Sequence, residues 1–171
     1  MIFVDRVNAL NNLADVETIS ASNPCGEQML PPYGACLLGS INLARLVTAP
    51  FESVARIDEG ELERLTETAI RFLDNVIDIS RYPLEAQATE ARAKRRIGLG
   101  ITGLADALIF CGAAYGSDAA VALTESWMGT IKRAAYRASA QLAADKGPTR
   151  SMKRSSSTGP ILRRLMTRPA R

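Results

Sequence analysis

The chain has 171 residues, of which 47% are hydrophobic and 23% charged, a composition typical of a soluble globular domain. It contains no histidine and three cysteines. This excludes Ser-His-Asp and Cys-His catalysis, zinc sites that need imidazole, and a four-cysteine zinc site. We therefore expect no metal site. The sparse, odd set of cysteines favours a reducing compartment, the cytoplasm, and no apolar run is long enough to span a membrane.

The formal charge of +3 is distributed unevenly along the chain. Residues 148–171 carry seven basic residues and no acidic one, whereas residues 1–147 carry 14 basic against 18 acidic residues, a net charge of −4. The basic segment is rich in serine and has no apolar period, so we expect a disordered or aberrant tail that is not native to the fold. A basic-tailed nucleic-acid binder is an alternative function that this segment leaves open, although we do not favour it.

Prolines and glycines are concentrated in residues 21–40, which predicts a loop with built-in backbone constraints. Residues 40–47 alternate well enough for a short strand or the start of a helix, and their period does not separate the two. Apolar residues then recur at helical spacing. This predicts three helices, over about 58–80, 101–114 and 118–146.

The expected helix ends carry capping signals. Asp58 and Ser117 stand at N-cap positions, and Glu61 completes a capping-box pattern with Asp58. Gly147, followed by a proline, ends the third helix. The spacing predicts a buried face of Leu62, Leu65, Ala69, Phe72, Leu73, Val76 and Ile77 on the first helix, and of Val121, Trp127, Met128, Ile131, Ala135 and Leu142 on the third.

The segment Asn23-Pro24-Cys25-Gly26-Glu27 is the most informative part of the chain. Pro24 pushes the residue before it toward an extended conformation. In an extended segment Asn23, Cys25 and Glu27 would share one face and present an amide, a thiol and a carboxyl together. From spacing alone, an ordinary turn with a buried cysteine remains the alternative.

The other two cysteines lie further along the chain. Cys36 is close enough in sequence to Cys25 to share a site and exchange disulfides there, or it is a small buried core residue. Cys111 lies in an apolar helix candidate, where we favour a structural role.

Three consecutive motifs follow one another here: residues 23–28 read Asn-Pro-Cys-Gly-Glu-Gln, residues 30–36 read Leu-Pro-Pro-Tyr-Gly-Ala-Cys, and residues 38–44 read Leu-Gly-Ser-Ile-Asn-Leu-Ala. Together they resemble the catalytic region of the large subunit of ribonucleotide reductases, and look most like the adenosylcobalamin-dependent (class II) type. The resemblance continues through residues 74–78, 82–84, 95–106 and 143–147, and so covers roughly residues 1–147.

The resemblance implies an α/β fold, with this chain a mostly helical fragment of the ten-stranded α/β barrel whose reactive loop passes through the centre. It implies conversion of ribonucleotides to 2′-deoxyribonucleotides by thiyl-radical chemistry, with the isolated chain inactive. The implied cofactor is adenosylcobalamin. The implied partners are a ribonucleotide substrate, a dithiol reductant such as thioredoxin, and the remaining segments of the reductase. A non-catalytic helical interaction module derived from the family is an alternative.

The resemblance also implies a role for each site residue. Cys25 would become the thiyl radical that takes the 3′-hydrogen of the ribose, and Glu27 would take the 3′-hydroxyl proton, which helps expel water from C2′. Asn23 would bind the substrate hydroxyls. Cys36 matches one member of the redox-active disulfide, whose partner comes from an earlier strand that we expect to be absent from this chain.

Two further patterns have competing interpretations. Residues 98–103 match the form Gly-x-Gly-x-x-Gly, but a charged segment precedes them where a dinucleotide site needs an apolar strand, so we favour close packing at a helix start. The basic run Lys94-Arg95-Arg96 could contact phosphate, but a solvated charged face is the interpretation that we favour.

Overall fold

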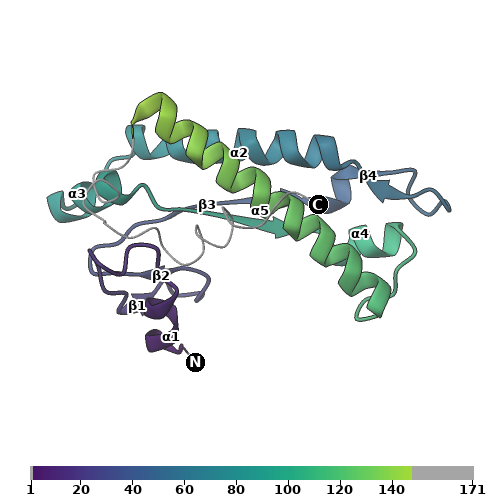
Figure 1. Ribbon diagram of the computed structural model, residues 1–171, viewed down its shortest axis with the longest axis horizontal. Coiled ribbons are helices and arrows are strands. Elements are labelled where there is room, and N and C mark those ends of the chain that lie inside the picture. The colour runs from purple at the N-terminus through teal and green to yellow at the C-terminus, as the bar shows by residue number, and fades with distance from the viewer. Residues whose placement is uncertain (1, 148–171) are drawn as a thin grey trace. The chain divides into compact units, whose positions relative to one another are not determined.

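The computed structural model describes residues 2–147 and divides them into two compact units (Figure 1). The first comprises residues 2–36, 77–96 and 147, and the second residues 37–76 and 97–146. The tail expected at 148–171 lies outside the described residues. No helix in the described part of the chain has the length and apolar character needed to cross a membrane.

The first unit contains a short hairpin and two helices. Its elements are α1 (Val4–Ala9), β1 (Ala21–Ser22), β2 (Met29–Leu30) and α3 (Glu85–Lys94). β1 and β2 pair antiparallel, with Ser22 opposite Met29. Asn8 of α1 fixes the approach to this hairpin, because its side chain accepts a hydrogen bond from the Ile19 amide at 2.8 Å and donates one to the Ile19 carbonyl at 2.9 Å.

The second unit is built on a β-α-β arrangement. Its elements are β3 (Leu37–Asn42), the 3-10 helix η1 (Leu43–Leu46), β4 (Val47–Thr48), β5 (Arg56–Ile57), α2 (Glu59–Ile79, except its last three residues), β6 (Ile97–Thr102), α4 (Leu104–Phe110) and α5 (Asp118–Lys146). Strands β3 and β6 are parallel, in a register that runs from Leu37 opposite Ile97 to Asn42 opposite Thr102. A parallel pair needs a long crossover connection, and α2 lies within it. For residues 40–47 the sequence period did not separate a strand from the start of a helix. In the structure these residues are divided between β3, η1 and the start of β4.

The expected helix over 101–114 is wrong at both ends, because its first turn belongs to a strand and the helix already ends at Phe110. Ile97, Leu99 and Ile101 alternate with residues 98, 100 and 102, which is the period of a strand, and they form β6. The helix α4 begins only at Leu104, after Gly103 at φ 66°. The glycines in this stretch concealed the strand, because glycine is uncommon within strands.

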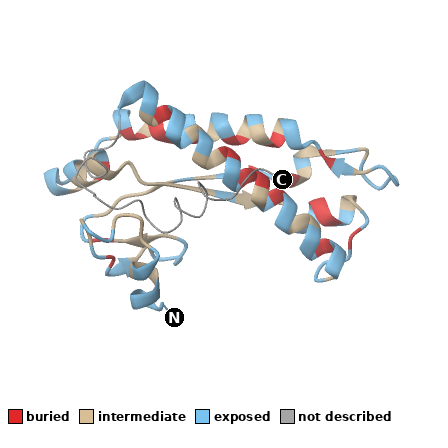
Figure 2. Cartoon of the chain, viewed as in Figure 1, coloured by how far each residue is buried: buried red, intermediate tan, exposed pale blue. Residues whose placement is uncertain are grey.

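Buried apolar residues gather in the second unit, where Ile41, Leu43, Leu62, Leu108 and Trp127 belong to one cluster (Figure 2). Removing each of these side chains from water contributes about 1.5–3 kcal/mol to folding. The expected apolar faces are partly wrong. Exposed side chains include Phe72 of α2 and Val121 and Met128 of α5, while Thr66 and Thr130 are buried.

The helix starts follow the expected caps with one correction. Asp58 Oδ1 accepts a hydrogen bond from the Glu61 amide at 3.0 Å, and Ser117 Oγ accepts one from the Ala120 amide at 3.2 Å. The carboxylate of Glu61, however, binds Arg64 at 2.6 Å and does not complete the capping box. The Asp58 amide donates instead to the Leu46 carbonyl at 3.4 Å.

Candidate active site

A tight turn connects β1 and β2 and presents Cys25 at its tip. The Gly26 amide donates to the Asn23 carbonyl at 3.0 Å, so that Pro24 and Cys25 are the central residues of the turn. Asparagine first, proline second and glycine fourth is a favoured order in β-turns. Gly26 continues at φ 80°, a left-handed conformation that favours glycine, and no other group would contact a Cβ at that position.

The expectation of an extended segment is therefore wrong, and so is the alternative of a buried cysteine. The segment is a turn, but Cys25 is exposed. The proline that disfavours a helical conformation for Asn23 also has the backbone angle needed at the second position of a turn. The backbone turn, rather than strand alternation, brings Asn23 and Glu27 together.

Asn23 connects the two sides of this turn. Its Oδ1 accepts a hydrogen bond from the Gln28 amide at 3.0 Å, while its Nδ2 donates to Glu27 Oε1. The backbone of Asn23 also donates to the Gln28 carbonyl at 3.1 Å. An amide anchored in this way fixes the orientation of the exposed Glu27 carboxylate, which is the group in the site that can accept a proton.

Cys36 lies at the end of the next loop, immediately before β3, and is half-buried. The pKa of its thiol is raised to about 11, mainly by burial; the Arg96 guanidinium acts to lower this pKa, and the Glu27 carboxylate acts to raise it. Two of the site residues expected from the sequence, Glu27 and Cys36, thus interact electrostatically within the first unit. With this pKa, the Cys36 sulfur carries its proton at neutral pH.

The basic run at the end of α3 is not a solvated face, contrary to expectation. The side chains of Lys94, Arg95 and Arg96 are 10%, 18% and 17% exposed. Arg95 binds Asp78 at 2.6 Å, whereas Lys94 and Arg96 both bind Glu17, at 2.7 and 2.5 Å. Nothing local in the sequence identifies Glu17 as the partner, since it lies 79 residues before Arg96.

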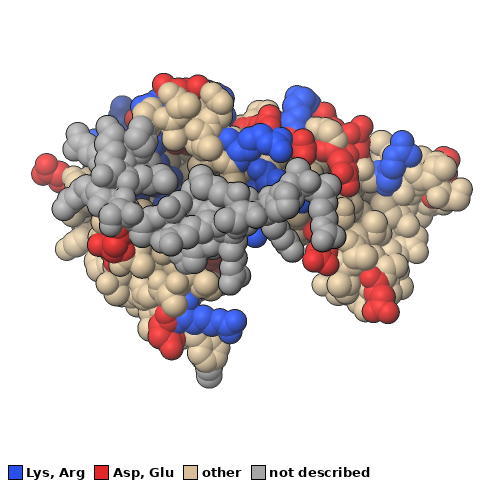
Figure 3. Space-filling view, in the orientation of Figure 1, with Lys and Arg blue, Asp and Glu red and all other residues tan. Residues whose placement is uncertain are grey.

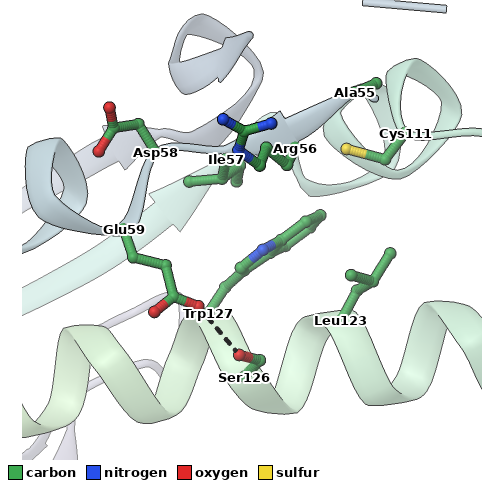
Figure 4. A pocket seen from close by; sticks show the side chains of 9 residues that line it. All are labelled: Ala55, Arg56, Ile57, Asp58, Glu59, Cys111, Leu123, Ser126 and Trp127. Atoms are coloured by element: carbon green, nitrogen blue, oxygen red, sulfur yellow. Dashed lines mark hydrogen bonds between the residues drawn. The ribbon is translucent and has the colours of Figure 1, made fainter. Parts of the chain in front are cut away.

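Cys111 contributes to a different cavity, of about 510 Å³, in the second unit (Figure 4). The cavity lies against α5, where Ser126 donates a hydrogen bond to Glu59 at 3.4 Å, and Trp127 and Leu123 form its apolar wall. Cys111 packs against the apolar cluster, and burial raises the pKa of its thiol. Both observations support the structural role expected from the sequence.

The glycine-rich residues 98–103 do not form a dinucleotide site. Gly98 and Gly100 lie inside β6, whereas the dinucleotide fingerprint places its glycines in the turn after a strand. Among residues 2–147 no group of three or more His, Cys, Asp or Glu side chains is arranged to hold a metal ion.

Comparison with known proteins identifies the family. The family model "Ribonucleotide reductase, barrel domain" matches residues 1–165. The chain belongs to the ribonucleotide reductase family. The match extends into the basic segment, beyond the residues whose motifs carry the resemblance.

Individual reductases agree with this assignment. The chain is 45% identical over 147 residues to the vitamin B12-dependent ribonucleoside-diphosphate reductase of Mycobacterium tuberculosis (strain H37Rv), and 41% identical over 147 residues to the protein of the same name from Thermoplasma acidophilum. It is 34% identical over 154 residues to the ribonucleoside-diphosphate reductase large chain of Neurospora crassa. These alignments cover 86% of this chain but 20%, 19% and 16% of the three relatives, so the chain spans about a fifth or less of their length.

Proposed function

We propose that this chain is the reactive-loop segment of a ribonucleotide reductase, which converts ribonucleotides to 2′-deoxyribonucleotides in the cytoplasm. The observation that carries the proposal is the β1–β2 turn, which exposes the Cys25 thiol and fixes the Glu27 carboxylate through Asn23. An exposed sulfur beside an oriented carboxylate matches the two functions required at the substrate, hydrogen-atom transfer and proton transfer.

In this proposal each side chain acts on the substrate ribose. Cys25, as a thiyl radical, takes the hydrogen atom from C3′ and forms an S–H bond, which leaves a radical on the sugar. Glu27 takes the 3′-hydroxyl proton, while the 2′-hydroxyl takes up a proton from a thiol of the redox-active pair and leaves C2′ as water. Asn23 binds the substrate hydroxyls and holds Glu27. Cys36 supplies reducing equivalents as one half of a redox-active pair, which a dithiol such as thioredoxin then reduces.

Adenosylcobalamin is the cofactor that we propose, because the relatives that are 45% and 41% identical to this chain are named vitamin B12-dependent. When bound, it supplies the radical that begins the reaction. The described residues fit a radical-generating cofactor in that the Cys25 sulfur is accessible. Cys25 lies at the tip of a turn with open space beside Gly26, so a radical-generating group can reach its sulfur.

A chimera tests the proposal. Residues 1–147 of this chain replace the matching segment of the Mycobacterium tuberculosis reductase, and deoxyribonucleotide formation is measured with adenosylcobalamin and a dithiol. We expect activity from the chimera and none from the isolated chain. Cys25→Ser and Glu27→Gln should abolish the activity of the chimera, whereas Cys111→Ser, which changes a thiol outside the turn, should retain most of it. A fully active Cys25→Ser chimera would contradict the proposal.

A further inference from the structure

Arg96 stands beside the site without a role in the proposed reaction. It directly precedes β6, as Cys36 directly precedes β3, and these parallel strands begin with Leu37 opposite Ile97. The register therefore places Arg96 and Cys36 at equivalent positions, each one residue before a paired strand. This placement agrees with the electrostatic interaction between the Arg96 guanidinium and the Cys36 thiol.

A buried carboxylate holds Arg96 in position. Glu17, whose side chain is 2% exposed, accepts hydrogen bonds from Arg96 Nη2 at 2.5 Å and from Asn11 Nδ2 at 2.9 Å. Lys94 contacts the second oxygen of Glu17 at 2.7 Å and also pairs with Glu90. Glu17, Glu90, Lys94 and Arg96 thus form a network without net charge. The planar guanidinium of Arg96 has five N–H donors, so it can bind Glu17 and still face another group.

We propose that Arg96 is a positioning residue for Cys36. The fixed positive charge of the Arg96 guanidinium stabilises the thiolate form of Cys36 during thiol–disulfide exchange. Burial and the Glu27 carboxylate both act against negative charge on the Cys36 sulfur. Arg96 offsets these two effects. Without it, Cys36 would be a poorer nucleophile and a poorer leaving group.

The step in which this charge matters is the reduction of a disulfide between Cys36 and a second cysteine of the complete enzyme. A thiolate of the external dithiol forms a bond to the second cysteine's sulfur, and the S–S bond breaks. Cys36 leaves with the electron pair as a thiolate and then takes a proton from water. The second thiol of the dithiol resolves the mixed disulfide, so that the dithiol is oxidised and both cysteines are reduced. A thiolate that is more stable leaves faster.

This inference rests on the proposed function of Cys36, but its test needs neither nucleotide nor cofactor. The full 171-residue chain carries Cys25→Ser and Cys111→Ser, so that Cys36 is its one thiol, and the rate of alkylation by iodoacetamide is measured from pH 7 to 11. Arg96→Gln should slow alkylation about three- to tenfold at pH 8–9, which corresponds to a rise of about 0.5–1 in the thiol pKa. Arg96→Lys, which keeps the charge, should recover at least half of that loss on a logarithmic scale.

Two matched variants separate an electrostatic role from a structural one. Arg95→Gln removes the neighbouring guanidinium, which pairs with Asp78, and should change the rate less than twofold. Glu27→Gln removes the opposing charge and should accelerate alkylation. In denaturing urea all the variants should react at one rate, because the effect requires the folded arrangement.

The inference is overturned if Arg96→Gln leaves the rate unchanged or raises it, if Arg95→Gln has an equal effect, or if Arg96→Gln and Glu27→Gln change the rate in the same direction. If Arg96→Gln loses its helical circular dichroism signal, Arg96→Lys and Glu27→Gln decide the question. The outcome is distinguishable from that of the chimera. An inactive chimera with the expected thiol rates contradicts the proposed function alone, and an active chimera with unchanged thiol rates contradicts the role of Arg96 alone.

Discussion

Lys146 Nζ, in the last turn of α5, lies 2.5 Å from Asp74 Oδ2 and 2.8 Å from Asn75 Oδ1 of α2. The Asp74 side chain is 10% exposed, and that of Lys146 is 33% exposed. Residues 74–78 and 143–147 are two of the segments that resemble the reductase family, so the ion pair gives both a common structural function in connecting α2 to the end of α5. The pair Arg71–Asp145, at 2.8 Å, reinforces this connection at the surface.

Lys146→Met should weaken the α2–α5 connection by about 1–3 kcal/mol, because it removes the ammonium group that lies 2.5 Å from the buried Asp74 carboxylate. Hydrogen exchange of peptides from both helices measures the effect, since about 1.4 kcal/mol corresponds to a tenfold faster exchange through local opening. Lys132→Met removes an exposed lysine from the same helix and serves as the matched control. The double variant Asp74→Asn/Lys146→Met should exchange more slowly than Lys146→Met alone, because it also removes the negative charge of the buried carboxylate. Equal effects of the two lysine variants would contradict this role.

Gly103 should tolerate alanine less well than Gly112 does. Both have a positive φ, 66° and 71°, so each alanine variant has a conformational cost of about 1 kcal/mol. At Gly103 the new Cβ would also clash with Asn42 Oδ1, whereas at Gly112 it would meet no other group within 4 Å. Thermal unfolding followed by circular dichroism should therefore show a clearly lower midpoint for Gly103→Ala than for Gly112→Ala. Similar midpoints would show that Asn42 moves aside easily.

The start of α2 should depend on Asp58 and not on Glu61. Asp58→Ala removes the oxygen that accepts a hydrogen bond from the Glu61 amide, and the loss of such a cap costs about 1 kcal/mol. Glu61→Gln should have no measurable effect on urea unfolding. The Arg64 hydrogen bond lowers the pKa of the Glu61 carboxyl, but this pair is solvent-exposed. If Glu61→Gln lowered the free energy of unfolding more than Asp58→Ala does, the capping-box interpretation would be restored.

The three thiols should be alkylated at different rates. Because the Cys36 pKa is raised to about 11, its thiolate is scarce at pH 8, and its alkylation rate should increase about tenfold per pH unit until the pH approaches that value. Cys25 is exposed at the turn and should be labelled first at pH 8. Cys111, whose pKa burial also raises, should lag behind it. Mass spectrometry of the labelled peptides follows each site, and a plateau in the Cys36 rate below pH 9 would contradict the raised pKa of its thiol.

Charge on the described residues gives no support to the nucleic-acid alternative. Where Figure 3 shows described residues, acidic side chains lie among the basic ones. The net charge of −4 over residues 1–147 agrees with this pattern.

The sequence by itself determined those parts of the molecule that depend on neighbouring residues. The helix α5, Asp118–Lys146, has the bounds expected from its apolar period, and α2, Glu59–Ile79, lies within one residue of the expected range at each end. The Asp58 and Ser117 caps form as expected, because a cap is a contact between residues two or three apart. The motif around Cys25 likewise singled out the segment that forms the β1–β2 turn, although not its conformation.

Only the tertiary structure decided which strands pair and where the charged groups lie. β6 forms because Ile97–Thr102 has β3 beside it, and its glycine-rich sequence does not favour a strand in isolation. Lys94 and Arg96 are withdrawn from solvent because Glu17, far away in the sequence, meets them there. The electrostatic effect of Arg96 on Cys36 likewise joins residues that are far apart in the sequence. Electrostatic energy depends on distance in space and on burial, and a local sequence pattern encodes neither across the 59 positions between Cys36 and Arg96.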